Sequence, residues 1–161
     1  MEVTPPRNRY QSEFQDPAGD ELNDLVQIER VLFLQDVALF SHCTAAEILR
    51  IAAIANEKRF EAGATVYEVN DAAETIHCVV EGAVGLENPA RDKATVSPGD
   101  AFGVIDILSG RLRTTRATAE TETRTLAIRA DDFFDLMSNN IGIVRALMHF
   151  LSDRVPTPLA W

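Results

Sequence analysis

The chain has 161 residues, of which 46% are hydrophobic, and a formal net charge of −10. This length suffices for one domain with a substantial apolar core and is short for two. The negative charge argues against nucleic-acid binding by this chain, because binding to a phosphate backbone depends on a positive field that releases counterions.

The first twenty residues lack hydrophobic periodicity and contain three prolines, which predicts a flexible arm or linker over residues 1–20. We expect one ordered domain over residues 21–155 and a tail over residues 156–161. The first predicted helix carries an apolar stripe at helical spacing, formed by Leu22, Leu25, Ile28 and Leu32.

A second helix is predicted to begin after Thr44. Thr44 and Glu47 have the spacing of a capping box, and Cys43 and Ile48 have that of a hydrophobic staple. The buried stripe of this helix is expected to comprise Ile48, Ile51, Ala52 and Ala55.

After Asn56 the pattern changes to short alternating runs separated by turn residues, which predicts an all-β region. Asn70 is expected to adopt a positive φ, and Gly82 is expected at a bulge or corner. The segment from Phe102 to Gly110 interrupts the strands with the spacing of a short helix. Two helices close the chain, over residues 131–138 and from Asn140 onward, the second with Val144, Leu147, Met148 and Leu151 on one face.

Several motifs within this order resemble those of the cyclic-nucleotide-binding domain family, which includes catabolite-activator-like and kinase-regulatory-subunit-like sensor domains. They are F-x-x-G at Phe60 to Gly63, the segment from Tyr67 to V-E-G at Gly82, P-G-D at Pro98 to Asp100, F-G at Phe102 and Gly103, and S-G-x-x-R ending at Arg113. The resemblance implies a mainly β fold with flanking helices. It would be an eight-stranded double-sheet β-roll or jelly-roll barrel with N-terminal helices, a short cassette helix and two C-terminal helices.

In that family the embedded helical turn is a phosphate-binding cassette, in which backbone amides and one arginine hold the cyclic phosphate and a glutamate after F-G binds the ribose. Arg113 falls at the arginine position, whereas Val104 stands where the glutamate is expected. Loss of a charged acceptor for a buried hydroxyl typically costs on the order of 1.5 to 3 kcal/mol. The cassette is therefore predicted to be degenerate. Its candidate ligand-binding residues are Arg113, Gly103, Val104, Ile105, Thr114 and Thr115.

No catalytic motif is present: the sequence contains neither G-x-S-x-G nor a P-loop. The histidines His42, His77 and His149 are far apart in sequence, and Cys43 and Cys78 form no C-x-x-C pair, so neither a metal site nor a required cofactor is predicted. No apolar run reaches the roughly 18 to 20 residues that span a bilayer, and we expect a cytoplasmic protein with no membrane contact of its own.

The expected function is that of a non-catalytic regulatory ligand-sensing domain, which binds a cyclic nucleotide (cAMP or cGMP) weakly or binds another small anion. The alternative is a vestigial pocket in a dimerisation or docking module of a larger protein, with the helix over residues 140–154 pairing with its copy in a homodimer. Trp161 could act as an aromatic lid over a base. A DNA-binding regulator would need a helix-turn-helix after Arg154, which this chain does not supply.

Overall fold

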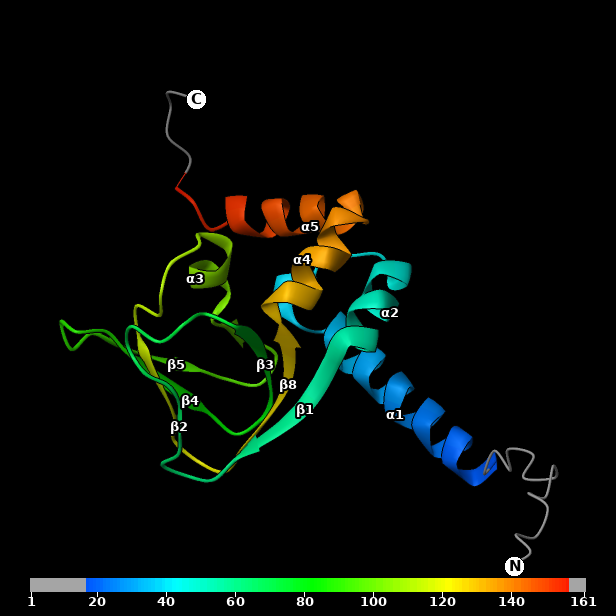
Figure 1. The fold of residues 1–161 in the computed structure, drawn as a ribbon, viewed down its shortest axis with the longest axis horizontal. Helices are drawn as coiled ribbons and strands as arrows, with labels where there is room; N and C mark the ends of the chain where they lie inside the picture. Colours follow the sequence, from blue (N-terminus) through cyan, green and yellow to red (C-terminus); the bar gives the residue numbers. More distant parts are fainter. Residues whose placement is uncertain (1–16, 157–161) are drawn as a thin grey trace, which may run out of the picture.

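Two four-stranded antiparallel sheets face each other and are flanked at one end by helices (Figure 1). The computed structural model describes residues 17–156, and the side chains of residues 26–156. The helices are α1 (Pro17–Gln35), the 3-10 turn η1 (Ala38–Phe40), α2 (Ala45–Ile54), α3 (Val104–Leu108), α4 (Ala130–Ser138) and α5 (Ile141–Ser152). The strands are β1 (Ala55–Phe60), β2 (Thr65–Tyr67), β3 (Thr75–Glu81), β4 (Val84–Glu87), β5 (Lys93–Val96), β6 (Ala101–Phe102), β7 (Arg116–Ala119) and β8 (Thr123–Arg129).

The strand orders are β1-β8-β3-β6 in one sheet and β2-β7-β4-β5 in the other. Strand β1 pairs along its whole length with β8, from Ala55 opposite Ile128 to Phe60 opposite Thr123. The mainly β class, the eight strands and the flanking helices are confirmed within the described residues. The expectation of a barrel is corrected, because each sheet retains two edge strands and the roll does not close.

Strand β3 separates two apolar cores. Ile76 and Cys78 pack with the helices, and Val79 packs with Phe102 between the sheets. Successive side chains of a strand point to opposite faces, so β3 is buried on both sides. Along the buried part of β3, alternate side chains therefore enter two different apolar cores, instead of one core and the solvent.

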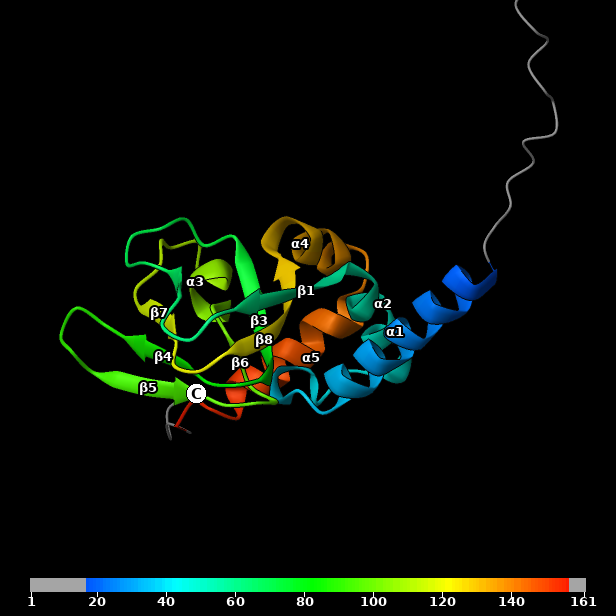
Figure 2. The same cartoon turned by 90° about the horizontal axis from the view of Figure 1, so that it is seen from below.

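Helix α1 projects away from the roll (Figure 2). It begins at Pro17, four residues before the expected start of order. The predicted stripe is wrong where the side chains are described: Ile28 and Leu32 are 55% and 58% exposed, whereas Leu34 is fully buried. Among the α1 side chains that the structure describes, those at the C-terminal end reach the core, so helical spacing alone misplaced the buried face. Leu22 and Leu25 lie outside the described side chains.

Helix α2 follows the sequence prediction closely. Thr44 accepts a hydrogen bond from the Glu47 amide while the Glu47 carboxylate accepts one from the Thr44 amide, which is the predicted capping box. The expected stripe is buried, and it comprises Ile48, Ile51, Ala52 and Ala55. The prediction from local sequence succeeds here because the capping residues and the apolar face both indicate the same helix.

Helix α5 lies across the end of the roll and packs against η1 and α4 (Figure 1). Its buried residues are Ile143, Ala146 and Leu147, so the predicted face was wrong at Met148, which is 65% exposed. No helix in the described part of the chain is long and apolar enough to cross a membrane. Trp161 lies outside the described residues, and the hypothesis of an aromatic lid is left as a prediction.

Candidate functional site

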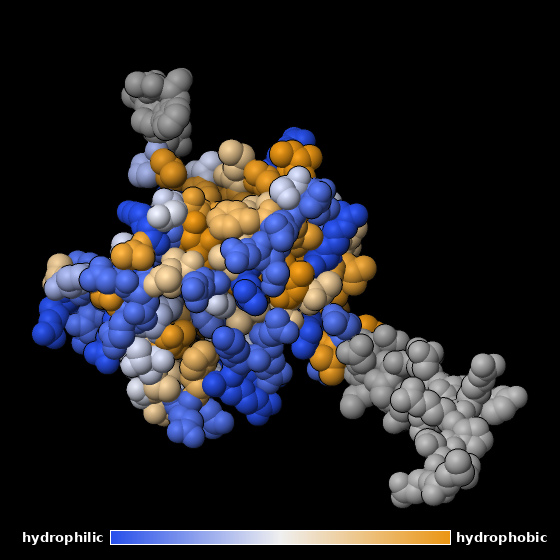
Figure 3. Space-filling model, viewed as in Figure 1, coloured by the Kyte–Doolittle hydropathy of each residue, from blue (hydrophilic) through white to orange (hydrophobic). Residues whose placement is uncertain are grey.

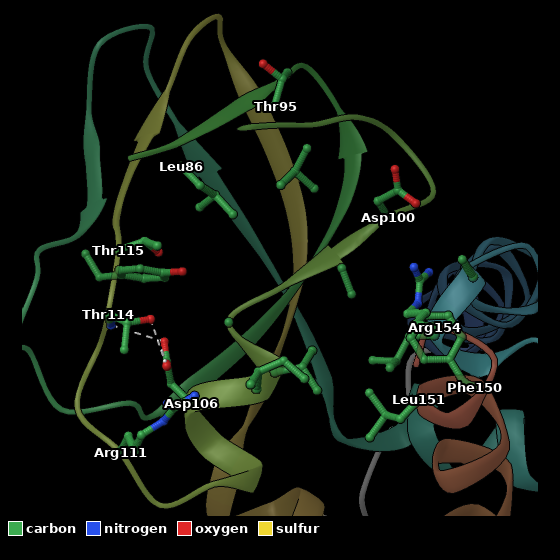
Figure 4. A pocket seen from close by; sticks show the side chains of 18 residues that line it. Leu86, Thr95, Asp100, Asp106, Arg111, Thr114, Thr115, Phe150, Leu151 and Arg154 are labelled. Atoms are coloured by element: carbon green, nitrogen blue, oxygen red, sulfur yellow. Dashed lines mark hydrogen bonds between the residues drawn. The ribbon is translucent and has the colours of Figure 1, made fainter. Parts of the chain in front are cut away.

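A cavity of about 470 Å³ lies between the second sheet, α5 and the cassette segment, by which we mean residues 103–115 (Figure 4). One wall comes from the cassette segment and the opposite wall from η1 and the end of α5. The lining residues are Ala38, Leu39, Tyr67, Leu86, Thr95, Val96, Asp100, Ala101, Gly103, Val104, Ile105, Asp106, Arg111, Thr114, Thr115, Phe150, Leu151 and Arg154. The cavity thus combines an apolar surface with a few polar groups, as small-molecule sites do.

The cassette segment begins at a glycine that the local geometry requires. Gly103 has φ of 81°, and a Cβ at this position would lie 2.8 Å from Nη1 of Arg113 and 3.1 Å from the Thr75 carbonyl oxygen. The five-residue α3 starts directly after it, and the Ser109 hydroxyl donates to the Ile105 carbonyl at its end. The F-G motif therefore sets the tight turn that places α3 beside the cavity.

Asp106 brings a carboxylate of the chain itself to the cassette. Its Oδ1 accepts a hydrogen bond from the Thr114 hydroxyl at 3.0 Å, and its Oδ2 accepts one from the Thr114 amide at 3.3 Å (Figure 4). Asp106 is 6% exposed and lies in the first turn of α3, where a negative charge is favourable. The Asp106 carboxylate thus occupies the hydroxyl and amide donors of Thr114, which an anionic ligand would otherwise reach.

Arg113 lies behind the cavity wall. Its guanidinium donates to the carbonyl oxygens of Gly103 at 2.7 Å and Thr75 at 2.5 Å, and it stacks 4.1 Å from the centroid of the Tyr67 ring. The side chain is 2% exposed and does not line the main cavity. Because Tyr67 borders both the main cavity and the smaller one that Arg113 lines, the phenol ring separates this guanidinium from the main cavity.

Two other arginines face the main cavity. Arg111 extends from the cassette segment, and Arg154 follows α5 and stacks 4.0 Å from the centroid of the Phe150 ring (Figure 4). Asp100 and Asp106 face the same space, so two carboxylates balance the two guanidinium groups. The cavity is charged but carries no net positive charge among its lining side chains.

A smaller cavity of about 330 Å³ lies behind Tyr67 and is bordered by Arg113 and His77. His77 stacks on Phe102, with ring centroids 5.1 Å apart, and its Nδ1 lies 3.1 Å from the Thr125 hydroxyl. Burial, together with the positive charges of Lys58 and Arg113, lowers the pKa of His77 to about 3. This imidazole is therefore neutral at physiological pH and serves the packing between the sheets.

Five of the six predicted site residues line the main cavity, namely Gly103, Val104, Ile105, Thr114 and Thr115. The sixth, Arg113, is near it but turned to backbone carbonyls. Sequence reasoning missed the Asp106 pair with Thr114, because the two residues are eight positions apart and no helix or turn spacing predicts their contact. It also missed Arg154 and the end of α5, for which the chain has no motif. As ligand contacts, all these residues are still predictions.

The sequence model of the family described as "Cyclic nucleotide-binding domain" matches residues 57–140, which is more than half of the chain. This chain belongs to the cyclic nucleotide-binding domain family. The matched stretch of the domain runs from β1 to the end of α4 and includes the whole cassette segment. The resemblance carried by the sequence motifs is thereby confirmed, and the domain is one of a family of regulatory ligand-binding modules.

The domain is 27% identical over 104 residues to a cyclic nucleotide-gated potassium channel of Mesorhizobium japonicum, a match that covers 65% of this chain. The chain spans 29% of the length of that channel.

Two solved structures have a TM-score of 0.70 to this domain. One is the regulatory subunit of a cAMP-independent protein kinase A from Trypanosoma brucei, with 17% identity over 83% of this chain and 47% of the other. The second is the regulatory domain of Toxoplasma gondii PKA with cAMP, with 19% identity over 83% of this chain and 52% of the other. At these identities the likeness establishes the fold alone.

Proposed function

We propose that the domain is a regulatory ligand sensor in which the main cavity takes a small molecule and α5 carries the response. The observation that supports this most directly is that one cavity is walled by the cassette segment on one side and by η1 and α5 on the other. A ligand that contacts both walls would favour one position of α5 over another, which is the differential interaction that a switch requires. No catalytic step is part of this proposal.

A cyclic nucleotide would bind weakly to the domain as it stands. Val104 offers no acceptor for a ribose hydroxyl, and the Arg113 guanidinium already donates to two carbonyl oxygens. The Asp106 carboxylate would also repel a cyclic phosphate near the Thr114 amide. Val104 acts on the ribose, whereas Arg113 and Asp106 both act on the phosphate, and all three lower the affinity.

The test is calorimetric titration with cAMP and with adenosine, which has the same base and no phosphate. Asp106→Asn removes the negative charge and retains an acceptor for Thr114, so we expect affinity for cAMP to rise about tenfold, equivalent to about 1.4 kcal/mol. Affinity for adenosine should change little. Val104→Glu should raise affinity for cAMP by about ten- to a hundredfold through the restored acceptor.

Glu61→Gln, which removes an exposed charge outside the cavity lining, is the matched control and should leave affinity for cAMP unchanged. Tight cAMP binding by the native domain, unaffected by Asp106→Asn, would contradict weak nucleotide binding. Absence of binding in every variant would contradict sensing of a cyclic nucleotide and favour a docking role.

Exposed apolar side chains on the closing helices favour docking as the second candidate function. Phe134 on α4 and Ile141 and Met148 on α5 are 43%, 73% and 65% exposed. Apolar atoms gather over this part of the molecule in Figure 3. A second copy of the chain is the partner that we propose for this face, and light scattering over a range of concentrations would detect the dimer.

A further inference from the structure

Side chains from two distant segments meet where α5 passes the turn after η1. His42 follows η1, while His149 and Asp153 lie four residues apart on one face at the end of α5. The His42 and His149 rings stack with centroids 3.7 Å apart. The fold therefore brings together two of the three histidines that sequence spacing left unconnected.

Each of these residues can supply one ligand atom, and the three atoms lie within 4.8 Å of one another. His42 Nε2 is 3.3 Å and His149 Nε2 is 3.8 Å from the oxygens of Asp153. Ligand atoms placed about 2.0 to 2.2 Å from one tetrahedral ion lie roughly 3.3 to 3.6 Å apart. The widest of the three separations must therefore shorten by as much as about 1.5 Å, and the stacked rings must turn until both nitrogens point at one ion. All three side chains are exposed, which leaves room for that movement.

The choice of donors favours a transition metal. Two imidazoles and one carboxylate are ligands suited to zinc, and three protein ligands leave a fourth position for water. All three side chains are exposed, so an ion in solution can reach them.

We propose that His42, His149 and Asp153 bind one divalent transition-metal ion of the zinc type, and that this ion fastens α5 to the turn after η1. Cys43, next to His42, is not part of the site. Its side chain packs against the helical core, and its sulfur is not among the ligand atoms that lie within reach of one another.

The position of the site gives the ion a structural consequence. Ala38 and Leu39 of η1 and Phe150 and Leu151 of α5 line the main cavity, and the ion would hold these two segments together. Ligand affinity in the cavity should then depend on metal, and metal affinity on ligand, by the same factor. This coupling rests on the proposed sensor function, whereas the metal site does not.

The test is calorimetric titration of the ligand-free domain with zinc chloride, and with magnesium chloride as the oxygen-preferring control. We expect one Zn²⁺ per chain and no comparable binding of Mg²⁺. His42→Ala, His149→Ala and Asp153→Asn should each weaken Zn²⁺ binding more than about tenfold, since even second-layer changes at metal sites cost 10- to 100-fold. Asp135→Asn removes an exposed charge from α4 and should leave the affinity unchanged.

Hydrogen exchange provides a second readout, because Zn²⁺ should slow exchange of the α5 amides in the native domain and leave it unchanged in His42→Ala. The proposal is overturned if the histidine variants bind Zn²⁺ as the native domain does, or if Cys43→Ser abolishes binding while His42→Ala does not. Zinc binding without any effect of cAMP on its affinity would leave the metal site intact and contradict the coupling alone.

Discussion

The two walls of the main cavity differ in how fully they are held by the rest of the domain. On the cassette side, Asp106 lines the cavity, Arg113 lies directly behind the wall, and the two are 6% and 2% exposed. Asp106 accepts hydrogen bonds from Thr114 of the same segment, and Arg113 donates to the carbonyl oxygens of Gly103 and Thr75. In the opposite wall, α5 buries one face and exposes Ile141 and Met148. One wall is fixed by buried polar contacts, whereas the other is a surface helix packed by its apolar side.

This difference indicates where motion is available. Buried hydrogen bonds resist local opening, while a helix with few buried contacts opens more readily. A ligand would therefore meet a preformed cassette and act on α5. The cassette segment is held in shape by hydrogen bonds from Arg113 and Thr114 to groups of the chain itself. These bonds use the same donors that an anionic ligand would need.

Arg113→Ala should have the largest effect on stability. It leaves the Gly103 and Thr75 carbonyl oxygens without their donor and opens space beside Tyr67, so we expect a loss of about 3 kcal/mol in the free energy of unfolding. Urea denaturation measures it. Arg111→Ala, which removes an exposed arginine of the same segment, should change stability by no more than about 0.5 kcal/mol. Equal effects of the two would contradict a structural role for Arg113.

The pH dependence of stability should reveal the neutral His77. Its pKa is about 3 in the folded state and near 6.5 when unfolded, so the unfolded chain alone takes up this proton as pH falls below 6.5. The contribution of His77 to stability is therefore complete above pH 6.5 and decreases below it, by about 2 kcal/mol between pH 7 and pH 5. Urea denaturation across this range should show a smaller decrease in His77→Gln. Parallel pH profiles for the two proteins would contradict the lowered pKa.

Gly103→Ala tests the turn that positions the cassette. An alanine at φ of 81° is strained, and its Cβ would crowd the Arg113 guanidinium, so we expect a loss of about 1 to 2 kcal/mol. Gly110→Ala is the matched control, because Gly110 also has a positive φ, 66°, and no atom within 4 Å of a Cβ. A thermal melt should show the larger decrease in Tm for Gly103→Ala. Equal decreases would show that strain alone, without the Arg113 contact, sets the effect.

The sequence predicted the features that depend on neighbours in the chain. The capping box of Thr44 and Glu47, the positive φ of Asn70 and the bend at Gly82 all follow from local chemistry and are confirmed. The buried faces of α1 and α5 were mispredicted because both helices are apolar on more than one side. Which side is buried depends on where the rest of the fold places its core.

In the candidate site, too, the local features were predictable from the sequence and the long-range contacts were not. Motifs placed the cassette segment correctly, since Phe102 and Gly103 begin a turn that sequence alone can indicate. The direction of the Arg113 side chain, the pairing of Asp106 with Thr114 and the meeting of His42 with His149 depend on contacts between residues from 8 to 107 positions apart. No periodicity encodes such contacts, so only the folded structure reveals them.

Met148→Gln should have the smallest effect and tests the other wall directly. Met148 is 65% exposed, and both residues are good helix formers, so the free energy of unfolding of a monomer should change by no more than about 0.5 kcal/mol. Urea denaturation at two protein concentrations provides the measurement. A loss above about 1 kcal/mol that grows with protein concentration would mean that a second copy covers this face of α5, because association stabilises by mass action. In that case α5 would be held as firmly as the cassette, and its freedom to respond to a ligand would depend on the dimer.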